Sequence, residues 1–448
     1  MKLVREVDEM DIATEYDVLV VGGGIAGMEA ALNLADMGFK VLLVEKEPSI
    51  GGKMILLSKV FPTLDCASCI ATPKMAATAH HPNITVLTYS EVEEVRKVKE
   101  GLFKVKVLKK PRYVKEDLCT GCQQCEFKCP VTVPDQFNYG MVARKAIYIP
   151  FSTATPRIAL IDIDNCILCG ICEQVCPADA IDFTEEPVEY EIEVGAVIIS
   201  TGFRLFPAEK MPNYGFGRFK NVITSMQMDR LLSPTRPYNT ILRPSDGRIP
   251  DKIAYVLCTG SRDKSVGNPL CSQVCCMYSI KQAQLLMGAL PLADIYIFYI
   301  DIRAFGKGFE EFYNQAKAMG VNFIKGKIAK IIEKENGNLI LRYEDIDDGG
   351  KLKEEEFDLV VLSVGLLPNP EIRKIFVHPS LELDEYGYVK VLDEELSPAK
   401  TNIDGVYVAG TATGPMDIPD SIISAGSAAA EAASYLSRYR EKAVEVRE

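Results

Sequence analysis

Two cysteine repeats have the most specific chemical spacing in this sequence. Each repeat has the pattern CxxCxxCxxxCP, and together they contain Cys119, Cys122, Cys125, Cys129, Cys166, Cys169, Cys172 and Cys176. In this pattern three thiolates bind three corners of a 4Fe–4S cubane, and the fourth cysteine binds the neighbouring cluster. Four-cysteine zinc sites use paired CxxC units without the trailing CP, so zinc fits poorly. We therefore expect one cluster at Cys119, Cys122, Cys125 and Cys176, and another at Cys166, Cys169, Cys172 and Cys129.

A third group of cysteines lies in LCTGSRDKSVGNPLCSQVCCMY, residues 257–278. Cys258, Cys271, Cys275 and Cys276 place four thiols within 19 residues, which is enough for one more 4Fe–4S cluster, although adjacent cysteines are irregular ligands. The alternative is a set of buried, unreactive thiols, because free cysteine is often buried. Four cysteines in so short a polar loop favour the cluster.

A nucleotide-binding pattern precedes these cysteines. The apolar run YDVLVV (16–21) leads into GGGIAG, and MEAALNLADMG (28–38) spaces its apolar residues as a helix does before the strand pattern KVLLVEK (40–46). Such a βαβ unit brings backbone close to a pyrophosphate at the helix N-terminus, while an acid ending the second strand accepts ribose hydroxyls. The expected contacts are Gly22, Gly24, Ile25, Ala26, Gly27, Glu45 and Lys46.

The C-terminal part of the chain indicates which dinucleotide is bound. DGVYVAG (404–410) resembles the second flavin fingerprint of flavoproteins with two dinucleotide-binding domains, and IISTGF (198–203) and VLSVGLLP (361–368) resemble their connecting motifs. Thr411 stands where an acid usually follows the glycine, and Asp417 or Asp420 is a candidate substitute. We expect FAD, with further contacts from Gly52, Lys53, Gly202, Gly410, Thr411, Asp420 and Ser421.

Lys53, Cys66 and Cys69 are further candidates for chemistry near the flavin. Lys53 is the candidate cation that would stabilise the reduced, anionic flavin, and the alternative is a solvated lysine. For Cys66 and Cys69, in DCASC, three interpretations stay open: a redox dithiol, which requires one stabilised thiolate, a ligand pair for a partner, or a buried pair.

The elements that must position these residues predict an α/β fold with two dinucleotide-binding domains. Composition shifts to Cys, Pro and Gly near residue 111, and a strand pattern resumes at 189, which predicts a ferredoxin-like domain inserted into a flavin domain. The expected parts are 1–110 (FAD domain), 111–188 (insertion with two 4Fe–4S clusters), 189–250 (FAD domain continuation and linker), 251–365 (NAD-binding-like domain with a further cluster) and 366–448 (FAD domain, C-terminal part). In the second α/β unit the cysteine segment replaces the glycine loop that a nicotinamide dinucleotide requires.

Composition limits the remaining possibilities. The net charge of −12 argues against nucleic acid or anionic lipid as the main partner, because both require a basic surface. The first 18 residues are charged and lack the apolar core of a signal peptide, and no stretch has the apolar length of a membrane span. We expect a cytoplasmic protein whose 14 cysteines are mostly metal ligands, because a reducing compartment disfavours a disulfide framework.

The segments GGGIAGMEAALNLADMGFKVLLVEKEPSIGGKM, FPTLDCASCIATPKM, CTGSRDKSVGNPLCSQVCCMYSIKQA and PDSIISAGSAAA, with the double cysteine repeat, resemble HdrA, the flavoprotein subunit of heterodisulfide reductase, and its relatives. The resemblance covers nearly the whole chain. It implies a thioredoxin-reductase-like FAD core with an inserted ferredoxin domain, and a cluster at the four cysteines of 258–276. It further implies a homodimer within a larger complex. This sequence departs from the long form, because the extra N-terminal and C-terminal domains are absent from it.

The same resemblance implies function. Full-length members perform flavin-based electron bifurcation, in which an electron pair delivered by a hydrogenase or formate dehydrogenase partner splits toward a disulfide and toward ferredoxin. Expected partners are therefore HdrB/HdrC-like subunits of heterodisulfide reductase, an electron-delivering subunit, and ferredoxin. The hypothesis is an oxidoreductase subunit in which FAD exchanges an electron pair for single electrons that leave through clusters. The alternative is an NAD(P)H-dependent reductase resembling the glutamate synthase small subunit; Asp301 and Arg303 leave room for it.

Overall fold

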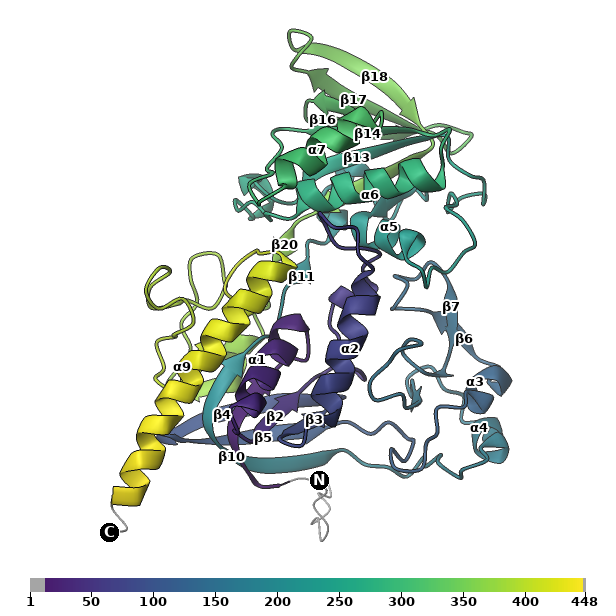
Figure 1. The fold of residues 1–448 in the computed structure, drawn as a ribbon. Coiled ribbons are helices and arrows are strands. Elements are labelled where there is room, and N and C mark those ends of the chain that lie inside the picture. The colour runs from purple at the N-terminus through teal and green to yellow at the C-terminus, as the bar shows by residue number, and fades with distance from the viewer. Residues whose placement is uncertain (1–12, 446–448) are drawn as a thin grey trace.

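The computed structural model describes residues 13–445; residues 1–12, which include most of the charged N-terminal segment, and 446–448 lie outside the described residues. Figure 1 shows two lobes, a lower one in which the described part of the chain begins and ends and an upper one, and a loop-rich segment with α3 and α4 beside the lower lobe.

A largely parallel sheet forms the centre of the lower lobe. Its strand order is β21-β4-β5-β10-β1-β2-β3, with β22 also paired to β10. Every residue of β2, and every residue of β1 except Glu15 and Asp17, is apolar and buried, as expected for parallel strands covered on both faces. The strands are β1 (Glu15–Val21), β2 (Val41–Val44), β3 (Ile84–Leu87), β4 (Ser90–Lys99), β5 (Leu102–Lys109), β10 (Val188–Ile199), β21 (Phe376–His378) and β22 (Val406–Val408).

Alternate residues of β1 enter two different cores. Val18 and Val20 pack against helices α1 (Ile25–Asp36), α2 (Ala67–His80) and α9 (Ile418–Glu445), which cover one face of the sheet. Leu19 and Val21 pack on the other face with apolar residues of β4 and β5 and of the short helix α8 (Ile372–Ile375). Because β1 pairs in parallel with β2 and β10, the glycines that follow β1 lie at the edge of the sheet where the carboxyl ends of these strands meet.

The cysteine repeats lie in an insertion, as predicted. Lys109 at the end of β5 pairs directly with Val188 at the start of β10, so the chain leaves and re-enters the sheet at one place. The small core of the insertion contains cysteines and apolar residues together. Its elements are α3 (Gln124–Lys128), β6 (Thr132–Pro134), β7 (Ala143–Lys145), β8 (Ile147–Tyr148), β9 (Leu160–Ile161) and α4 (Ile171–Val175).

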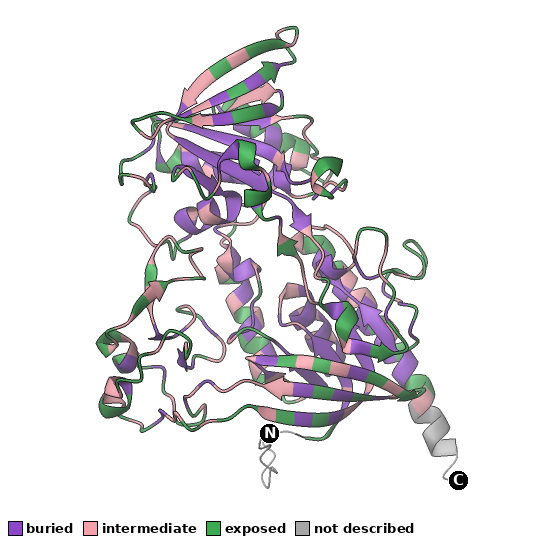
Figure 2. Ribbon diagram, turned by 180° about the vertical axis from the view of Figure 1, so that it is seen from behind, coloured by how far each residue is buried: buried purple, intermediate pink, exposed green. Residues whose placement is uncertain are grey.

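The upper lobe contains a second parallel sheet with the order β12-β19-β13-β14-β15. Helices α5 (Ser225–Leu232), α6 (Cys275–Ala289) and α7 (Phe309–Ala318) contribute to the core on one face, and the antiparallel strands β16, β17 and β18 to the core on the other. In Figure 2 the strands of this sheet are mostly buried. The strands are β12 (Val222–Thr224), β13 (Lys252–Thr259), β14 (Asp294–Tyr299), β15 (Asn322–Lys325), β16 (Ile328–Glu333), β17 (Leu339–Asp345), β18 (Lys351–Phe357) and β19 (Leu359–Val364).

The boundary between the two lobes differs from the predicted one. The chain crosses at the paired strands β11 (Arg204–Leu205) and β20 (Leu366–Leu367), and residues 206–250, expected to be flavin domain and linker, belong to the upper lobe. Thr224 and Gln227 form a reciprocal capping box that starts α5. That threonine–glutamine spacing was visible in the sequence and would have indicated a helix there.

Candidate cofactor sites

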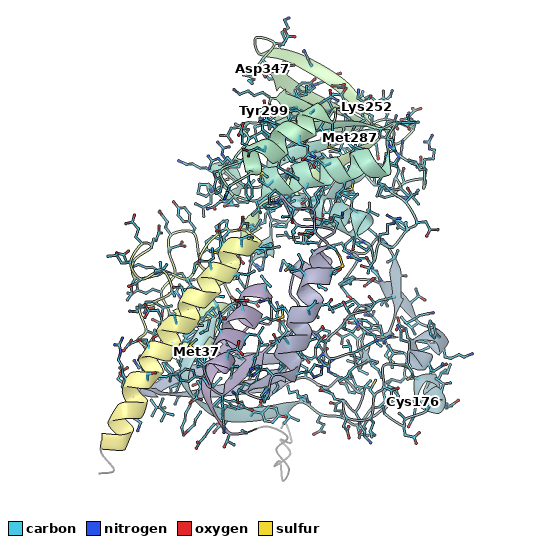
Figure 3. All side chains as sticks on the ribbon, viewed as in Figure 1. Met37, Cys176, Lys252, Met287, Tyr299 and Asp347 are labelled. Atoms are coloured by element: carbon cyan, nitrogen blue, oxygen red, sulfur yellow. A yellow bond between two sulfur atoms is a disulfide. The ribbon has the colours of Figure 1, made fainter. Side chains whose placement is uncertain are left out.

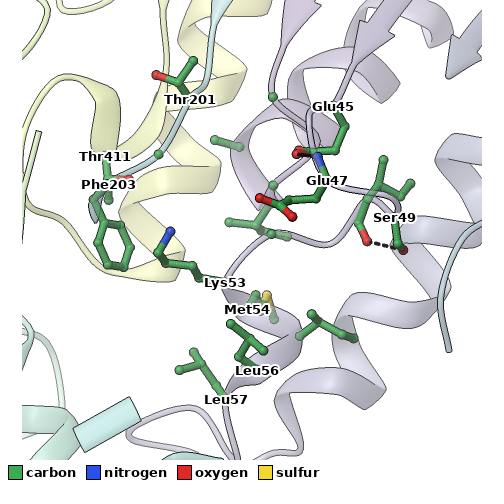
Figure 4. A pocket seen from close by; sticks show the side chains of 18 of the residues that line it. Glu45, Glu47, Ser49, Lys53, Met54, Leu56, Leu57, Thr201, Phe203 and Thr411 are labelled. Carbon is green, nitrogen blue, oxygen red and sulfur yellow. Dashed lines mark hydrogen bonds between the residues drawn. The ribbon is translucent and has the colours of Figure 1, made fainter. Parts of the chain in front are cut away.

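A cavity of about 1350 Å³ lies where the lower lobe, the insertion and the upper lobe meet. It exceeds the usual ligand pocket of about 300–1000 Å³, so it has room for a large cofactor. Eleven of the predicted FAD contacts line it: Gly22, Gly24, Ile25, Ala26, Glu45, Lys46, Gly52, Lys53, Gly202, Thr411 and Ser421. Figure 4 shows part of this wall.

The glycine loop fits a pyrophosphate. Gly22 has φ +107°, and a Cβ on it would stand 2.5 Å from the Ser200 carbonyl oxygen. A Cβ on Gly27 would stand 1.9 Å from the Gly22 carbonyl oxygen, so Gly27 allows the tight turn without itself lining the cavity. Gly24 is the N-cap residue of α1, and no side chain caps the helix there. A Cβ built on Gly24 would have nothing within 4 Å. Open backbone N–H groups at a helix N-terminus attract phosphate.

Glu45 lies at the end of β2 and is 7% exposed. Its Oε2 accepts a hydrogen bond from the Gly23 N–H at 2.6 Å, and its Oε1 accepts one from the Glu47 N–H at 2.8 Å. Burial raises the pKa of this carboxyl, and the two backbone donors partly oppose that shift. The carboxylate therefore links the glycine loop to the strand end, where it can accept ribose hydroxyls.

The Lys53 side chain points away from Glu45 and toward Phe203, whose ring centre is 5.0 Å from Nζ (Figure 4). Burial lowers the pKa of Lys53, with Lys46 as a second cause. Lys53 is thus a half-buried residue of the cavity wall, and its position beside a flavin stays a prediction.

Of the predicted FAD contacts in the C-terminal part of the chain, Asp420 is not where the prediction placed it. Thr411 and Ser421 are buried in the cavity wall, whereas Asp420 is exposed and outside it. Asp417, the other candidate acid, lines the cavity, and burial raises its pKa. Gly410 lies behind the wall, where a Cβ would stand 2.7 Å from the Cβ of Ala26.

The structure adds a charged pair that sequence reasoning missed. Lys281 of α6 and Asp229 of α5 line the cavity with 1% and 2% of their side chains exposed, and Nζ lies 2.6 Å from Oδ1. Asp229 also accepts hydrogen bonds from Ser58 and from Gln282. A single lysine in an amphipathic helix resembles a solvated residue, so no local signal in the sequence indicated this pair.

The first predicted set of cluster ligands comes together in the insertion. Cys119, Cys122, Cys125 and Cys176 line one small cavity of about 20 Å³. Figure 3 shows Cys176 beside α4. Within residues 13–445, no three His, Cys, Asp or Glu side chains are grouped to hold a single metal ion, as a zinc site would require. The spacing of the four thiols, CxxCxxC with a distant CP, is the one that 4Fe–4S clusters use.

The two repeats also share a backbone conformation. Gly121 and Leu168 occupy equivalent positions with φ of 65° and 54°, and Gln123 and Gly170 do so with φ of 65° and 70°. Left-handed residues at matching places bend each loop around its sulfurs. Cys125 and Cys172 are buried, and burial raises the pKa of both thiols, to about 12 for Cys125.

Backbone donors reach two of the remaining sulfurs. The Ala180 N–H lies 3.3 Å from Cys176 Sγ, and the Leu168 N–H lies 3.4 Å from Cys166 Sγ. Cys129 and Cys166 lie in the same core as Cys125 and Cys172. Hydrogen bonds of this kind and burial are the means by which proteins set cluster potentials.

The third cysteine group lies at the C-terminal end of β13 and the start of α6. The ladder between β13 and β19 has a bulge between Val256 and Thr259, and Cys258 in it has φ 57°. The Cys258 and Cys276 thiols each interact with Cys275, which begins α6. The Gln273 N–H lies 3.3 Å from Cys271 Sγ. The loop thus presents the four predicted donors around one helix start, which fits a cluster.

The same loop leaves little for a nicotinamide dinucleotide to bind. The N–H groups of Arg262 and Asp263 donate to the carbonyls of Leu270 and Asn268, so they are not available to a pyrophosphate. Asp301, which would meet the ribose, forms ion pairs with Arg262 and Arg303. The helix end that serves phosphate in ordinary dinucleotide-binding units carries thiols here.

Cys66 and Cys69 form a disulfide at the start of α2, with Cα atoms 5.2 Å apart. Cys66 is the N-cap residue of the helix and Cys69 is exposed. Of the three interpretations of these cysteines, a buried pair is therefore wrong for Cys69.

Comparisons with known proteins agree with this geometry. The FAD dependent oxidoreductase family matches residues 17–65, the 4Fe-4S dicluster domain matches 118–181, and the pyridine nucleotide-disulphide oxidoreductase family matches 298–432. The A-type iron-sulfur subunit of CoB–CoM heterodisulfide reductase from Methanocaldococcus jannaschii is 46% identical over 431 residues, which are 96% of this chain and 65% of that protein. The A-type subunit of the H2/formate:CoB–CoM heterodisulfide, ferredoxin reductase from Methanococcus maripaludis is 44% identical, over 98% of this chain and 67% of that protein.

The chain belongs to the HdrA family of heterodisulfide reductase subunits. It spans about two thirds of the length of these relatives. Thioredoxin reductase of T. acidophilum superposes with a TM-score of 0.53 at 16% identity, covering 94% of this chain and 99% of that one, which confirms the predicted two-domain flavoprotein fold. FAD-dependent and 4Fe–4S dicluster domains are thus both present. In the part of this family member that the structure describes, no helix is long and apolar enough to cross a bilayer.

Proposed function

We propose that this chain is the FAD-carrying and iron–sulfur-carrying electron-transfer subunit of a heterodisulfide-reductase-like complex. The observation that supports this most is the position of α6. Val274, Tyr278 and Lys281 line the flavin cavity, while Cys275 and Cys276 between them belong to the third cysteine group. One helix start therefore joins the flavin site to a one-electron site.

Different groups of residues would bind FAD, place charge beside it and bind the clusters. When bound, FAD supplies the exchange between an electron pair and single electrons. The glycine loop and Glu45 would hold the dinucleotide, and Lys53 would place positive charge in the cavity wall, where it favours a reduced, anionic ring. The three cysteine groups hold 4Fe–4S clusters at Cys119/Cys122/Cys125/Cys176, Cys166/Cys169/Cys172/Cys129 and Cys258/Cys271/Cys275/Cys276.

Partners follow from the proposed subunit role. The names of the relatives mention heterodisulfide reductase, ferredoxin, hydrogen and formate. We propose the same classes here: HdrB-like and HdrC-like subunits, an electron-delivering hydrogenase or formate dehydrogenase module, ferredoxin, and a second copy of this chain. Electron bifurcation, the homodimer and a cytoplasmic location stay predictions.

The alternative, a self-sufficient NAD(P)H reductase, has less support. The upper lobe lacks the second GxGxxG, its loop N–H groups are internally bonded, and Asp301 is paired with Arg262. No described feature of the cysteine loop favours a nicotinamide.

Counting cofactors in matched variants tests the proposal. Reconstituted wild-type protein should contain about twelve iron atoms and one FAD per chain, because it carries three cubanes. Cys271→Ala and Cys176→Ala should each lose about four iron atoms and keep FAD. Unchanged iron in Cys271→Ala would refute the third cluster, and loss of FAD together with iron would indicate a folding defect rather than ligand loss.

A further inference from the structure

We propose that the ferredoxin-like insertion forms one wall of the site for the adenine of FAD, and that Tyr148 and Arg144 are the residues that hold the base. This assignment rests on the proposed function, because FAD is its ligand. Both residues line the flavin cavity, although neither was among the FAD contacts predicted from the sequence.

Glu45 marks the end of the cavity at which the adenine lies. Its carboxylate can accept the ribose hydroxyls, and the adenine is attached to that ribose. Tyr89 and Ser90 also belong to this end, because their N–H groups donate to the carbonyls of Glu47 and Glu45. All four residues line the cavity. The insertion contributes further lining residues: Arg144, Tyr148, Leu160 and Asp162.

The insertion leaves the lower lobe beside this end of the cavity. Ser90 at the start of β4 pairs with Lys109, the last residue of β5 before the insertion. Arg112 follows, is wholly buried, and donates through Nη2 to the Pro48 carbonyl at 2.8 Å and to Thr88 Oγ1 at 2.6 Å. The base of the insertion is therefore fixed to the ends of the strands that carry the ribose acid.

A second part of the insertion is bonded to the loop after β2. The Thr155 N–H donates to Ser49 Oγ at 2.8 Å, and the Ile50 N–H donates to the Thr155 carbonyl at 3.1 Å. Ser49 lines the cavity and lies on the same side of it as Glu45 (Figure 4). The insertion is thus held against the cavity at two places, one before and one after the proposed adenine contacts in the sequence.

Tyr148 and Arg144 form a stacked pair of planar groups. The Arg144 guanidinium lies 3.8 Å from the centre of the Tyr148 ring, and its Nη2 lies 2.8 Å from Asp162 Oδ2. Burial raises the pKa of Tyr148 to about 12; Arg144 opposes this shift, and Tyr89 and Glu47 are among the groups that add to it. The phenol is therefore neutral and lies near the loop that follows the ribose acid. Aromatic rings and guanidinium groups both stack on the flat face of a base.

Equilibrium titration of FAD-depleted, cluster-loaded protein with FAD and with ADP tests this assignment. ADP carries the adenosine and the pyrophosphate but no flavin, so the loss of an adenine contact should weaken both ligands by the same factor. We expect Tyr148→Ala to raise both dissociation constants about 5-fold to 150-fold, the usual effect of removing a ring that stacks on a base.

Two further variants separate this contact from a folding effect. Phe127→Ala is the matched control, because Phe127 is an aromatic residue of the same insertion that is 71% exposed and outside the cavity; both affinities should stay at the wild-type value. Tyr148→Leu keeps apolar bulk but has no ring, so it should weaken FAD and ADP as Tyr148→Ala does. The iron content of each variant should equal that of the wild type.

Amide hydrogen exchange gives a readout that a merely structural role for Tyr148 would not change. In the wild type, ADP should slow exchange both in residues 22–27 of the glycine loop and in residues 143–162 of the insertion, because a ligand stabilises the segments that it contacts. In Tyr148→Ala, saturating ADP should still protect the glycine loop and should protect the insertion much less.

Four results would overturn the assignment and leave the proposed function intact. They are wild-type affinities in Tyr148→Ala, weaker FAD with unchanged ADP, ADP protection confined to the glycine loop, and loss of iron in both Tyr148 variants, which would make the residue a structural part of the insertion. Wild-type protein that binds neither FAD nor ADP would instead refute the proposed function.

Discussion

Replacing Asp229 by asparagine should destabilise the upper lobe strongly. The Lys281 ammonium and the Asp229 carboxylate are almost wholly buried and lie 2.6 Å apart. Asparagine keeps the shape but removes the charge, which leaves a buried ammonium without its counter-ion. Breaking a buried pair in this way costs about 3–5 kcal/mol. For a domain of this size, each kcal/mol lowers Tm by about 2–4 °C, so we expect a fall of roughly 6–20 °C.

A matched control separates burial from ion pairing as such. Lys252 and Glu355 are also 2.6 Å apart, but 29% and 25% of their side chains are exposed. Glu355→Gln should therefore cost only about 0–1 kcal/mol. In the double variant Asp229→Asn/Lys281→Met no unpaired buried charge remains, and most of the lost stability should return.

Calorimetry of the FAD-depleted protein gives these values without the contribution of bound cofactor. Equal losses of Tm in Asp229→Asn and Glu355→Gln would refute the reasoning. So would additive effects in the double variant, because they would show that Lys281 and Asp229 do not interact.

The other predictions concern the flavin site. Gly27→Ala should abolish FAD retention, measured as bound flavin after gel filtration, because a Cβ there meets the Gly22 carbonyl oxygen at 1.9 Å; normal retention would contradict the tight turn. Glu45→Gln should weaken FAD binding by about 1.5–3 kcal/mol by titration, since a charged acceptor is lost. In FAD-depleted protein Glu45→Gln should raise Tm at pH 7, because burial raises the pKa of Glu45 and makes its charged form unfavourable in the folded state. This gain in Tm should vanish as pH falls through the raised pKa. A gain in Tm that persists below pH 4.5 would contradict the reasoning. Burial lowers the pKa of Lys53, so FAD-depleted Lys53→Met should have a higher Tm than the wild type at neutral pH. The difference in Tm between the two proteins should close as pH rises from the lowered pKa toward 10.5. A difference in Tm that does not change with pH would argue against burial as the cause.

The sequence was most informative where chemistry depends on spacing. The four cysteines predicted to bind the first cluster, including Cys176 from the second repeat, line one cavity. The glycine loop was predicted for a similar reason, because Gly22 and Gly27 occupy positions where a Cβ would meet backbone atoms.

Long-range placement was not predictable in the same way. Asp229 and Lys281 lie 52 residues apart, and only the packing of α5 on α6 brings them together. Asp417, not Asp420, lines the cavity, because the side chain of Asp417 accepts the Asp420 N–H at the start of α9 and faces inward. The lobe boundary was placed too late in the chain because the Pro-rich and Arg-rich stretch near 231–250 suggested a linker, although Leu231 and Ile241 are buried in the upper core.

The central claim is that electrons reach this flavin through protein-bound clusters and not through a nicotinamide. Anaerobic mixing of the reconstituted chain with NADH, with NADPH and with dithionite, followed by flavin absorbance, tests it most directly. We expect no bleaching by either nicotinamide, with dithionite reducing both the flavin and the clusters. Rapid bleaching by NADH or NADPH would contradict the claim, because the cysteine loop after β13 would then have to admit a dinucleotide.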